Sequence, residues 1–154
     1  MTASGTELAR GRALHAGEGT GVSLAIGPLS FWGGVDWHDG RIIDVHHDHH
    51  GETVAGRVLV MPHGRGSSSA AVVLAETIRN GSAPVAVVTR STDLILLVGA
   101  MAAVELYGRA CPILELDADA FERVVALGAV RLHVVCDDDA GTISTTPPAT
   151  RAAG

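Results

Sequence analysis

The sequence predicts an α/β domain in which helices cover a mostly parallel sheet, with an additional N-terminal β layer. The chain has 154 residues, enough for one domain with a sizeable core. It is 47% hydrophobic but only 3% aromatic, so the core must consist of aliphatic side chains, as in proteins with buried sheets. After Gly56, apolar strand patterns alternate with helix patterns, which is typical of a parallel sheet with helical crossovers.

The N-terminal third favours β structure followed by loops. Residues 8–15 and 22–26 alternate between apolar and polar side chains, which predicts two strands, and the glycine-rich segment 17–20 predicts the turn between them. We expect a loop over 28–36 and a polar, histidine-rich loop over 37–52. The two strands are expected to form a second layer against the same core.

The remaining two thirds of the chain predicts strands and helices in alternation, with punctuating residues at their ends. Asn80-Gly81 ends one helix, and Asp93 and Gly108 bracket the next, as helix-capping preferences expect. We therefore expect strands at 57–61, 84–89, 112–116 and 130–135, and helices at about 68–80, 93–107 and from 117 or 119 to 127.

We expect residues 7–136 to form a single domain with disordered segments on either side. Residues 1–6 are polar and lie at a chain terminus, where order is often lost. Residues 137–154 are acidic at first and then rich in Thr, Pro and Ala, a composition with too few apolar side chains to fold.

The charge and hydropathy of the chain exclude several kinds of partner. Its formal net charge is −6, and it has no stripe of Lys and Arg, so we expect neither nucleic acid nor a membrane surface as a partner. No apolar run approaches the roughly 20 residues of a membrane span, and the N-terminal residues lack the pattern of a secretory signal. We therefore expect a cytoplasmic protein.

The two cysteines, Cys111 and Cys136, limit the chemistry of the chain. They give no disulfide framework, and the favoured interpretation of both is a small buried side chain. An iron–sulfur cluster usually needs three or four thiolates, which two cysteines cannot supply. If the protein works with such a cluster, another chain must carry it.

The segment 63–69, His-Gly-Arg-Gly-Ser-Ser-Ser, is the strongest candidate site because it links a predicted strand to a predicted helix. Backbone N–H groups and the helix dipole suit such a turn to an anion. Arg65 could pair with a carboxylate, and Ser67 or Ser68 could cap the helix, bind an anion or supply a reactive hydroxyl. The turn has neither the Walker A ending nor the pattern of a nucleophile elbow. The residues alone leave capping, anion binding and catalysis open.

Two further segments are candidates with weaker signals. The loop residues Phe31, Trp32, Gly33 and Gly34 could form a pocket wall or an interface, or could plug the core. The histidine run at 46–50 looks like a metal site, but adjacent residues of an extended chain point to opposite faces. We interpret the run as a solvated loop and predict no metal site.

Several strings of residues in a fixed order resemble a known family. They are Leu-Ser-Phe-Trp-Gly-Gly-Val-Asp at 29–36, Gly-Glu-Thr-Val-Ala-Gly-Arg-Val-Leu-Val at 51–60, Gly-Arg-Gly-Ser-Ser-Ser at 64–69, Ala-Pro-Val-Ala at 83–86 and Leu-Tyr-Gly at 106–108. Over residues 8–116 the chain resembles the small subunit of aconitase X. That family includes mevalonate 5-phosphate dehydratase and cis-3-hydroxy-L-proline dehydratase.

The resemblance implies a fold, a reaction and a partner. It implies the swivelling β/β/α domain of aconitase, acting as the small subunit of a hydro-lyase that is inactive without a large subunit carrying an iron–sulfur cluster. Ser67 matches the serine that accepts the proton from a β-hydroxy acid substrate. Ordinary aconitases have Arg two places further on, where this chain has Ser69, and this departure fits the aconitase X branch. The substrate-binding residues would be Gly64, Arg65, Gly66, Ser68 and Ser69.

A second hypothesis comes from a different functional class. The chain could be a non-catalytic anion-binding module or a phosphohistidine-type swivel module, in which His63 beside the turn would carry the phosphoryl group. Phosphohistidine swivel domains have a similar layered shape. A large-subunit partner would favour the dehydratase over this alternative.

Overall fold

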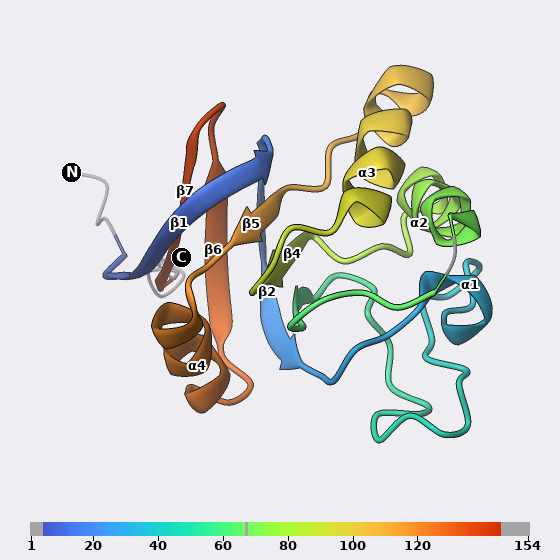
Figure 1. The fold of residues 1–154 in the computed structure, drawn as a ribbon, viewed down its shortest axis with the longest axis horizontal. Coiled ribbons are helices and arrows are strands. Elements are labelled where there is room, and N and C mark those ends of the chain that lie inside the picture. The colour runs from blue at the N-terminus through green and yellow to red at the C-terminus, as the bar shows by residue number, and fades with distance from the viewer. Residues whose placement is uncertain (1–4, 67, 146–154) are drawn as a thin grey trace, which may run out of the picture.

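The computed structural model describes residues 5–66 and 68–145. The strands are β1 Glu7–His15, β2 Gly17–Ala25, β3 Val58–Val60, β4 Ala86–Thr89, β5 Ile113–Glu115, β6 Arg131–Cys136 and β7 Ala140–Thr145. The helices are α1 Phe31–Gly34, α2 Ser69–Asn80, α3 Leu94–Tyr107 and α4 Ala118–Ala126. The strands close into a barrel in the order β1-β5-β4-β3-β2-β6-β7 (Figure 1).

The barrel mixes parallel and antiparallel pairs. β2 pairs with β3, β3 with β4 and β4 with β5, all in parallel. β1 pairs with β5 and β7, and β6 with β2 and β7, all antiparallel. The prediction of a mostly parallel sheet with a separate N-terminal layer is therefore wrong, because β1 and β2 are members of the same barrel. Their long-range pairing provides hydrogen-bond partners for the backbone N–H and C=O groups of strands that would otherwise form the edges of the sheet.

Two glycines show why the sequence misled at the start of β2. Gly19 and Gly21 lie within this strand, and a Cβ at either position would collide with a backbone oxygen of a neighbouring segment. They permit a close approach of two parts of the chain rather than a chain reversal. The predicted turn over 17–20 is thus part of a strand, and the break between β1 and β2 falls at Ala16.

The prediction of disorder after residue 136 is also wrong over the last strand. The Asp137 carboxylate accepts hydrogen bonds from the backbone N–H groups of Asp139, at 2.8 Å, and Ala140, at 2.7 Å. These bonds lower the pKa of Asp137 and fix the turn of a hairpin between β6 and β7. Residues 1–4 and 146–154, for which disorder is also predicted, lie outside the described residues.

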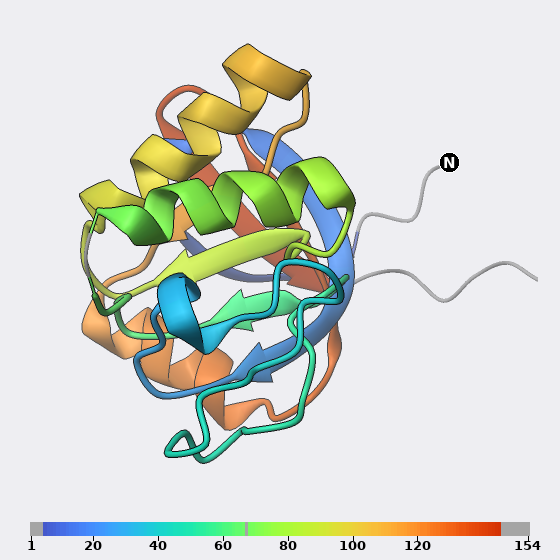
Figure 2. The same cartoon turned by 90° about the vertical axis from the view of Figure 1, so that its right-hand side faces the viewer.

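Alternate residues of the parallel strands enter two apolar cores. Val58 and Val60 of β3 belong to the core that includes Leu132 of β6 and Phe121 of α4. Leu59, between them, belongs to the core beneath α2 and α3. Figure 2 shows α2 and α3 lying across one side of the barrel, with α4 on another side. Both faces of the parallel strands are therefore covered, which explains their unbroken apolar runs.

The helix-end signals in the sequence are confirmed. Asp93 caps α3 and Asp117 caps α4, each accepting hydrogen bonds from first-turn N–H groups. Gly81 and Gly108 follow α2 and α3 in the left-handed conformation, with φ of 79° and 65°. Helices α2 and α3 thus each follow a parallel strand, β3 and β4 respectively, after a short connecting segment.

Candidate functional site

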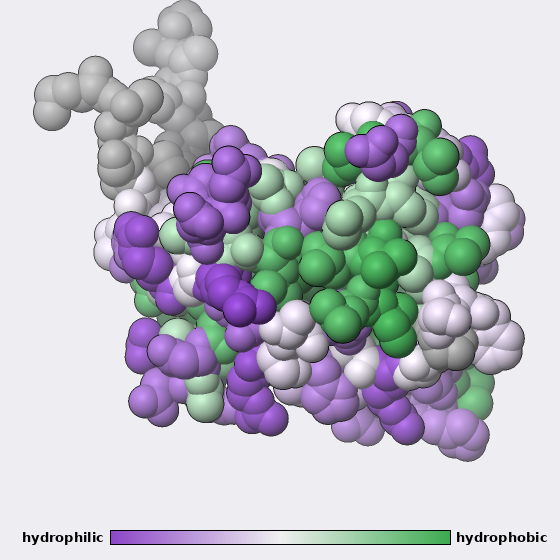
Figure 3. Space-filling view, turned by 45° about the horizontal axis from the view of Figure 1, so that its top comes forward, coloured by the Kyte–Doolittle hydropathy of each residue, from purple (hydrophilic) through white to green (hydrophobic). Residues whose placement is uncertain are grey.

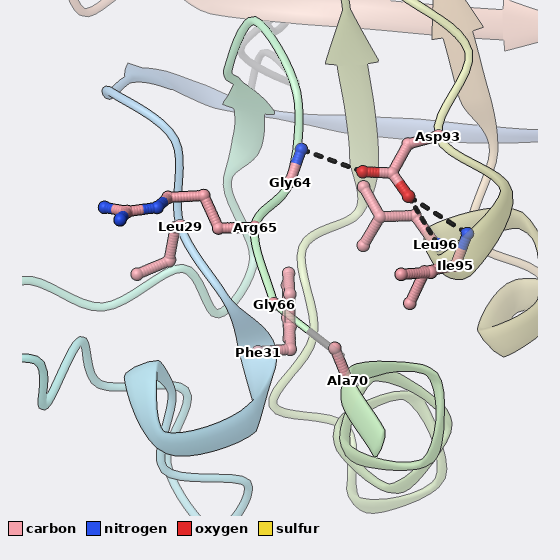
Figure 4. Close-up of a pocket in the computed structure, with 9 residues that line it drawn as sticks. All are labelled: Leu29, Phe31, Gly64, Arg65, Gly66, Ala70, Asp93, Ile95 and Leu96. Carbon is pink, nitrogen blue, oxygen red and sulfur yellow. Dashed lines mark hydrogen bonds between the residues drawn. The ribbon is translucent and has the colours of Figure 1, made fainter. Parts of the chain in front are cut away.

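The serine turn, residues 63–69, lies at the carboxyl end of β3 and is tied to two neighbouring segments. Gly64 forms a parallel bridge with Leu29, and the Arg65 N–H donates a hydrogen bond of 3.1 Å to the Leu29 carbonyl. On its other side, the Gly64 N–H donates a 2.8 Å hydrogen bond to Asp93 Oδ2 (Figure 4). The turn is thereby fixed between the loop before α1 and the start of α3.

Asp93 connects the turn to the helix layer. Its Oδ1 accepts hydrogen bonds from the N–H groups of Ile95, at 3.0 Å, and Leu96, at 3.1 Å, while Oδ2 accepts the bond from Gly64. Sequence reasoning predicted the cap but missed the link to Gly64, which is 29 residues away. The available signal was topological, because both residues follow the carboxyl ends of adjacent parallel strands.

The glycines of the turn are required by its geometry. A Cβ on Gly64 would lie 2.6 Å from Asp93 Oδ2, which would displace the carboxylate. Gly66 has a φ of 100°, and its Cβ would collide with the Ser30 hydroxyl. Their predicted role in admitting a ligand remains a prediction, while their role in the turn follows from these contacts.

The serines of the turn lie at the N-terminus of α2. Ser67, the predicted base, lies outside the described residues, between Gly66 and Ser68. Ser68 is the N-cap residue, and its side chain makes no capping hydrogen bond. Ser69 is the first residue of the helix, and both described serines are exposed. These two residues therefore lie at the positive end of the dipole of a twelve-residue helix.

Two cavities flank the turn, and Arg65 and Gly66 line both of them. The smaller, of about 60 Å³, is shown in Figure 4 and is large enough only for a few water molecules. The larger, of about 300 Å³, reaches the lower end of the size range of small-ligand pockets. Its lining residues are Pro28, Ser30, Trp32, Asp44, Arg65 and Gly66.

The two aromatic residues of the loop at 28–36 have different surroundings, one in the core and one at the larger cavity. Phe31 is fully buried and packs in the core under α2, whereas Trp32 is 61% exposed and lines the larger cavity. Gly33 is exposed with a φ of 74°, and Gly34 is buried against Leu29. The two interpretations of this loop therefore apply to different residues: Phe31 plugs the core, and Trp32 is available to a ligand or a partner.

The cysteines do not fit an iron–sulfur cluster. Cys111 and Cys136 are both buried, and their thiols lie against the carbonyls of Pro84 and Ile113. Burial raises the pKa of Cys111 to about 12 and that of Cys136 to about 11. Protonated, enclosed thiols are poor metal ligands, so the predicted interpretation as buried small side chains is confirmed.

The histidine run is held by hydrogen bonds within its own loop and to the segment between β2 and α1. His47 Nε2 lies 3.2 Å from the Gly27 carbonyl, and the His49 N–H donates a 3.0 Å hydrogen bond to His47 Nδ1. His46 and His50 are exposed. Over residues 5–66 and 68–145, no group of three or more His, Cys, Asp or Glu side chains is arranged to hold a metal ion.

Comparison with known proteins places this fold and turn in one family. The model of the aconitase X swivel domain matches residues 8–145, so the chain belongs to the aconitase X swivel domain family. The resemblance found in the sequence and the swivel fold that it implied are thereby confirmed. The family match also includes β7, which sequence reasoning had assigned to a disordered tail.

The curated relatives include two kinds of dehydratase. The chain is 44% identical over 122 residues to the cis-3-hydroxy-L-proline dehydratase of Pseudomonas aeruginosa, covering 79% of this chain and 21% of the relative. It is 39% identical over 93 residues to the phosphomevalonate dehydratase small subunit of Methanothermobacter thermautotrophicus, covering 60% of this chain and 71% of the relative. This chain thus spans only about a fifth of the hydroxyproline enzyme but most of the separate small subunit.

Solved structures share the fold. The crystal structure of Thermococcus kodakaraensis aconitase X in its holo form superposes with a TM-score of 0.72 at 29% identity, covering 86% of this chain and 95% of that one. A solution structure of a UPF0107 protein gives a TM-score of 0.74 at 31% identity, covering 92% of this chain and all of that one. Among the described helices, none is long and apolar enough to cross a membrane.

Proposed function

We propose that this chain is the small subunit of an aconitase X-type hydro-lyase that dehydrates a β-hydroxy acid, either mevalonate 5-phosphate or cis-3-hydroxy-L-proline. The observation that carries the proposal is the serine turn of an aconitase X swivel domain, bordered by a 300 Å³ cavity with a guanidinium at its wall. A cavity of that size accommodates a small hydroxy acid. Arg65 can bind the carboxylate of such a substrate through two parallel hydrogen bonds.

Ser67 takes the proton in the proposed reaction. As an alkoxide it removes a proton from one carbon, the C–H electron pair forms the carbon–carbon double bond, and hydroxide leaves the next carbon. In this proposal the dipole of α2, which begins at Ser69, stabilises negative charge on the Ser67 oxygen. Ser67 ends the step as a neutral hydroxyl and must release its proton before the next turnover.

The group that receives the hydroxide belongs to the large subunit in this proposal. The two thiols of the small chain are buried and protonated, so they do not fit a cluster. We therefore propose that the iron–sulfur cluster is on the partner, and that the substrate lies between the serine turn and the partner's surface. The small subunit supplies the base and the carboxylate-binding residue.

An apolar face beside the turn suits that partner. Leu94, Val98 and Met101 of α3 are 67%, 56% and 53% exposed, and Val72 of α2 is 66% exposed. Figure 3 shows apolar side chains gathered on this side of the molecule. Between the two helices runs a groove of about 170 Å³, lined by Ala71, Val72, Ala75, Glu76, Val98, Ala102, Leu106 and Tyr107. Exposed apolar area of this kind marks protein interfaces.

The large subunit is the occupant that fits this α2–α3 face. The face begins at the site itself, because Leu94 follows Asp93 and Val72 lies about one helical turn beyond Ser68. The hydroxyproline enzyme from Pseudomonas aeruginosa matches this chain over 21% of its length, so that relative carries a large additional part in the same polypeptide. A partner covering this face would also close the site against water.

The proposal is tested by producing the chain alone and together with an aconitase X large chain of the same organism. We expect the isolated chain to lack both iron and dehydratase activity, and the purified complex to have both. The assay follows loss of mevalonate 5-phosphate and of cis-3-hydroxy-L-proline. Activity of the isolated chain, or an iron-loaded complex that dehydrates neither compound, would contradict the proposal.

Val98→Glu tests the α2–α3 face. A carboxylate in the centre of an apolar interface should weaken the complex at least about tenfold, because its desolvation is uncompensated. The isolated variant should keep its free energy of unfolding within about 0.5 kcal/mol, since Val98 is exposed. The matched control is Leu127→Glu, since Leu127 is 40% exposed at the end of α4, away from this face. Equal co-purification of the two variants with the large chain would exclude the face as the interface.

A further inference from the structure

The larger cavity beside the serine turn contains one group of each charge. Arg65 comes from the turn, and Asp44 comes from the long loop between α1 and β3. The two side chains line the same space of about 300 Å³ without forming an ion pair with each other. In Figure 4 the Arg65 side chain extends away from Asp93, so its guanidinium does not pair with the Asp93 carboxylate on the other side of the turn.

Both charged groups keep capacity for a ligand. Asp44 Oδ1 accepts a 2.9 Å hydrogen bond from the His46 N–H, and within the described chain Oδ2 has no hydrogen-bond partner. The Arg65 guanidinium likewise makes no hydrogen bond to any described residue. The hydrogen bond of Arg65 to the Leu29 carbonyl comes from its backbone N–H group. The cavity is therefore lined by a guanidinium and a carboxylate that are not paired with each other. Such a pair can bind a molecule that carries both a negative and a positive charge.

Two other lining groups add to this arrangement. The Trp32 ring is 61% exposed and lines the same cavity, and an indole face attracts an ammonium group. The Ser30 hydroxyl oxygen is buried there without a hydrogen-bond partner among the described residues. It can bond to a substrate hydroxyl or carboxylate, which would satisfy an otherwise costly buried group.

We infer that this cavity binds a zwitterionic imino acid, with Arg65 on its carboxylate and Asp44 on its ammonium group beside the Trp32 ring. The inference rests on the proposed function and selects between the two substrate classes of the relatives. cis-3-Hydroxy-L-proline carries a carboxylate and a secondary ammonium group bonded to the same carbon. Mevalonate 5-phosphate carries only negative charges, and Asp44 would repel its phosphate. Asp44 is thus the specificity-determining residue of the site.

Asp44→Asn in the complex with the large chain tests this inference. The asparagine oxygen still accepts the His46 N–H bond, so the loop keeps its local support. We expect kcat/KM for cis-3-hydroxy-L-proline to fall about 10- to 100-fold, mainly through KM, because a charged hydrogen bond to the ammonium group is lost. kcat/KM for mevalonate 5-phosphate should not fall. The control is Asp48→Asn, an exposed acid of the same loop that is not among the residues lining the cavity.

The outcomes separate this inference from the proposed function. The wild-type complex should prefer the imino acid over the phosphorylated acid. A complex that prefers mevalonate 5-phosphate, or an Asp44→Asn variant with an unchanged KM for the imino acid, would overturn the inference and leave the dehydratase proposal intact. A complex that acts on neither compound would overturn the proposed function itself.

Discussion

Replacing Ser67 by Ala should lower kcat of the reconstituted complex by roughly 10²- to 10⁴-fold, the usual contribution of a positioned general base. KM should change little, because Arg65 and the other residues of the proposed substrate cavity are unaltered. Steady-state kinetics on the complex measures both quantities. Co-purification with the large chain and an unchanged iron content would show that the loss lies in the chemistry and not in assembly.

The control for this variant is Ser144→Ala, which removes a hydroxyl from β7, away from the turn. Its kcat should stay within about twofold of the wild type, since it contacts no part of the site. If Ser67→Ala retained near wild-type turnover, the assignment of the base would be wrong, and the proton would have to pass to a group on the large subunit.

Asp93→Ala should have the second largest effect, because it removes three hydrogen bonds to backbone N–H groups in one change. The loss of the cap and the unpaired Gly64 N–H together should lower the free energy of unfolding by about 1–3 kcal/mol. Activity of the complex should fall at least about tenfold, because the serine turn loses its hydrogen bond to Asp93 at the start of α3 and the proposed base would lose its position. Urea unfolding and kcat/KM measure the two effects.

Asp117→Ala is the matched control for Asp93→Ala. Asp117 caps α4 with one hydrogen bond to the Ala120 N–H, at 2.8 Å, and among the described residues it makes no hydrogen bond to the serine turn. We expect a loss of about 1 kcal/mol in stability with activity preserved. If the two variants lost activity equally, Asp93 would be only a helix cap, and its bond to Gly64 would have no role in positioning the turn.

Local structure followed from the sequence wherever neighbouring residues determine it. The capping aspartates Asp93 and Asp117 and the left-handed Gly81 and Gly108 predicted the helix ends because the hydrogen bonds of a cap span only a few residues. The barrel could not be predicted in this way. Its closure depends on β1 and β2 pairing with strands more than a hundred residues away, and local patterns carry no such information.

The candidate site shows the same division between local and long-range information. The segment 63–69 was recognisable because strand, glycine turn and helix follow one another directly. Asp44 and Ser30 were not recognised as its neighbours, since they reach the cavity from loops that precede the turn by about twenty residues or more. Asp93 was recognised for its cap alone. The assignment of Ser67 as the base stays a prediction, which the Ser67→Ala experiment decides.

A ring of strands leaves no row of backbone N–H and C=O groups open for a visiting strand over the described part of the chain. The proposed large subunit would then bind through side chains and not by adding a strand, and the strength of that binding could change one surface residue at a time without disturbing the domain. This independence suits a module that is encoded as a detached subunit in one relative and as a fifth of a longer polypeptide in another. Gene fission or fusion would require no redesign of the module's interior.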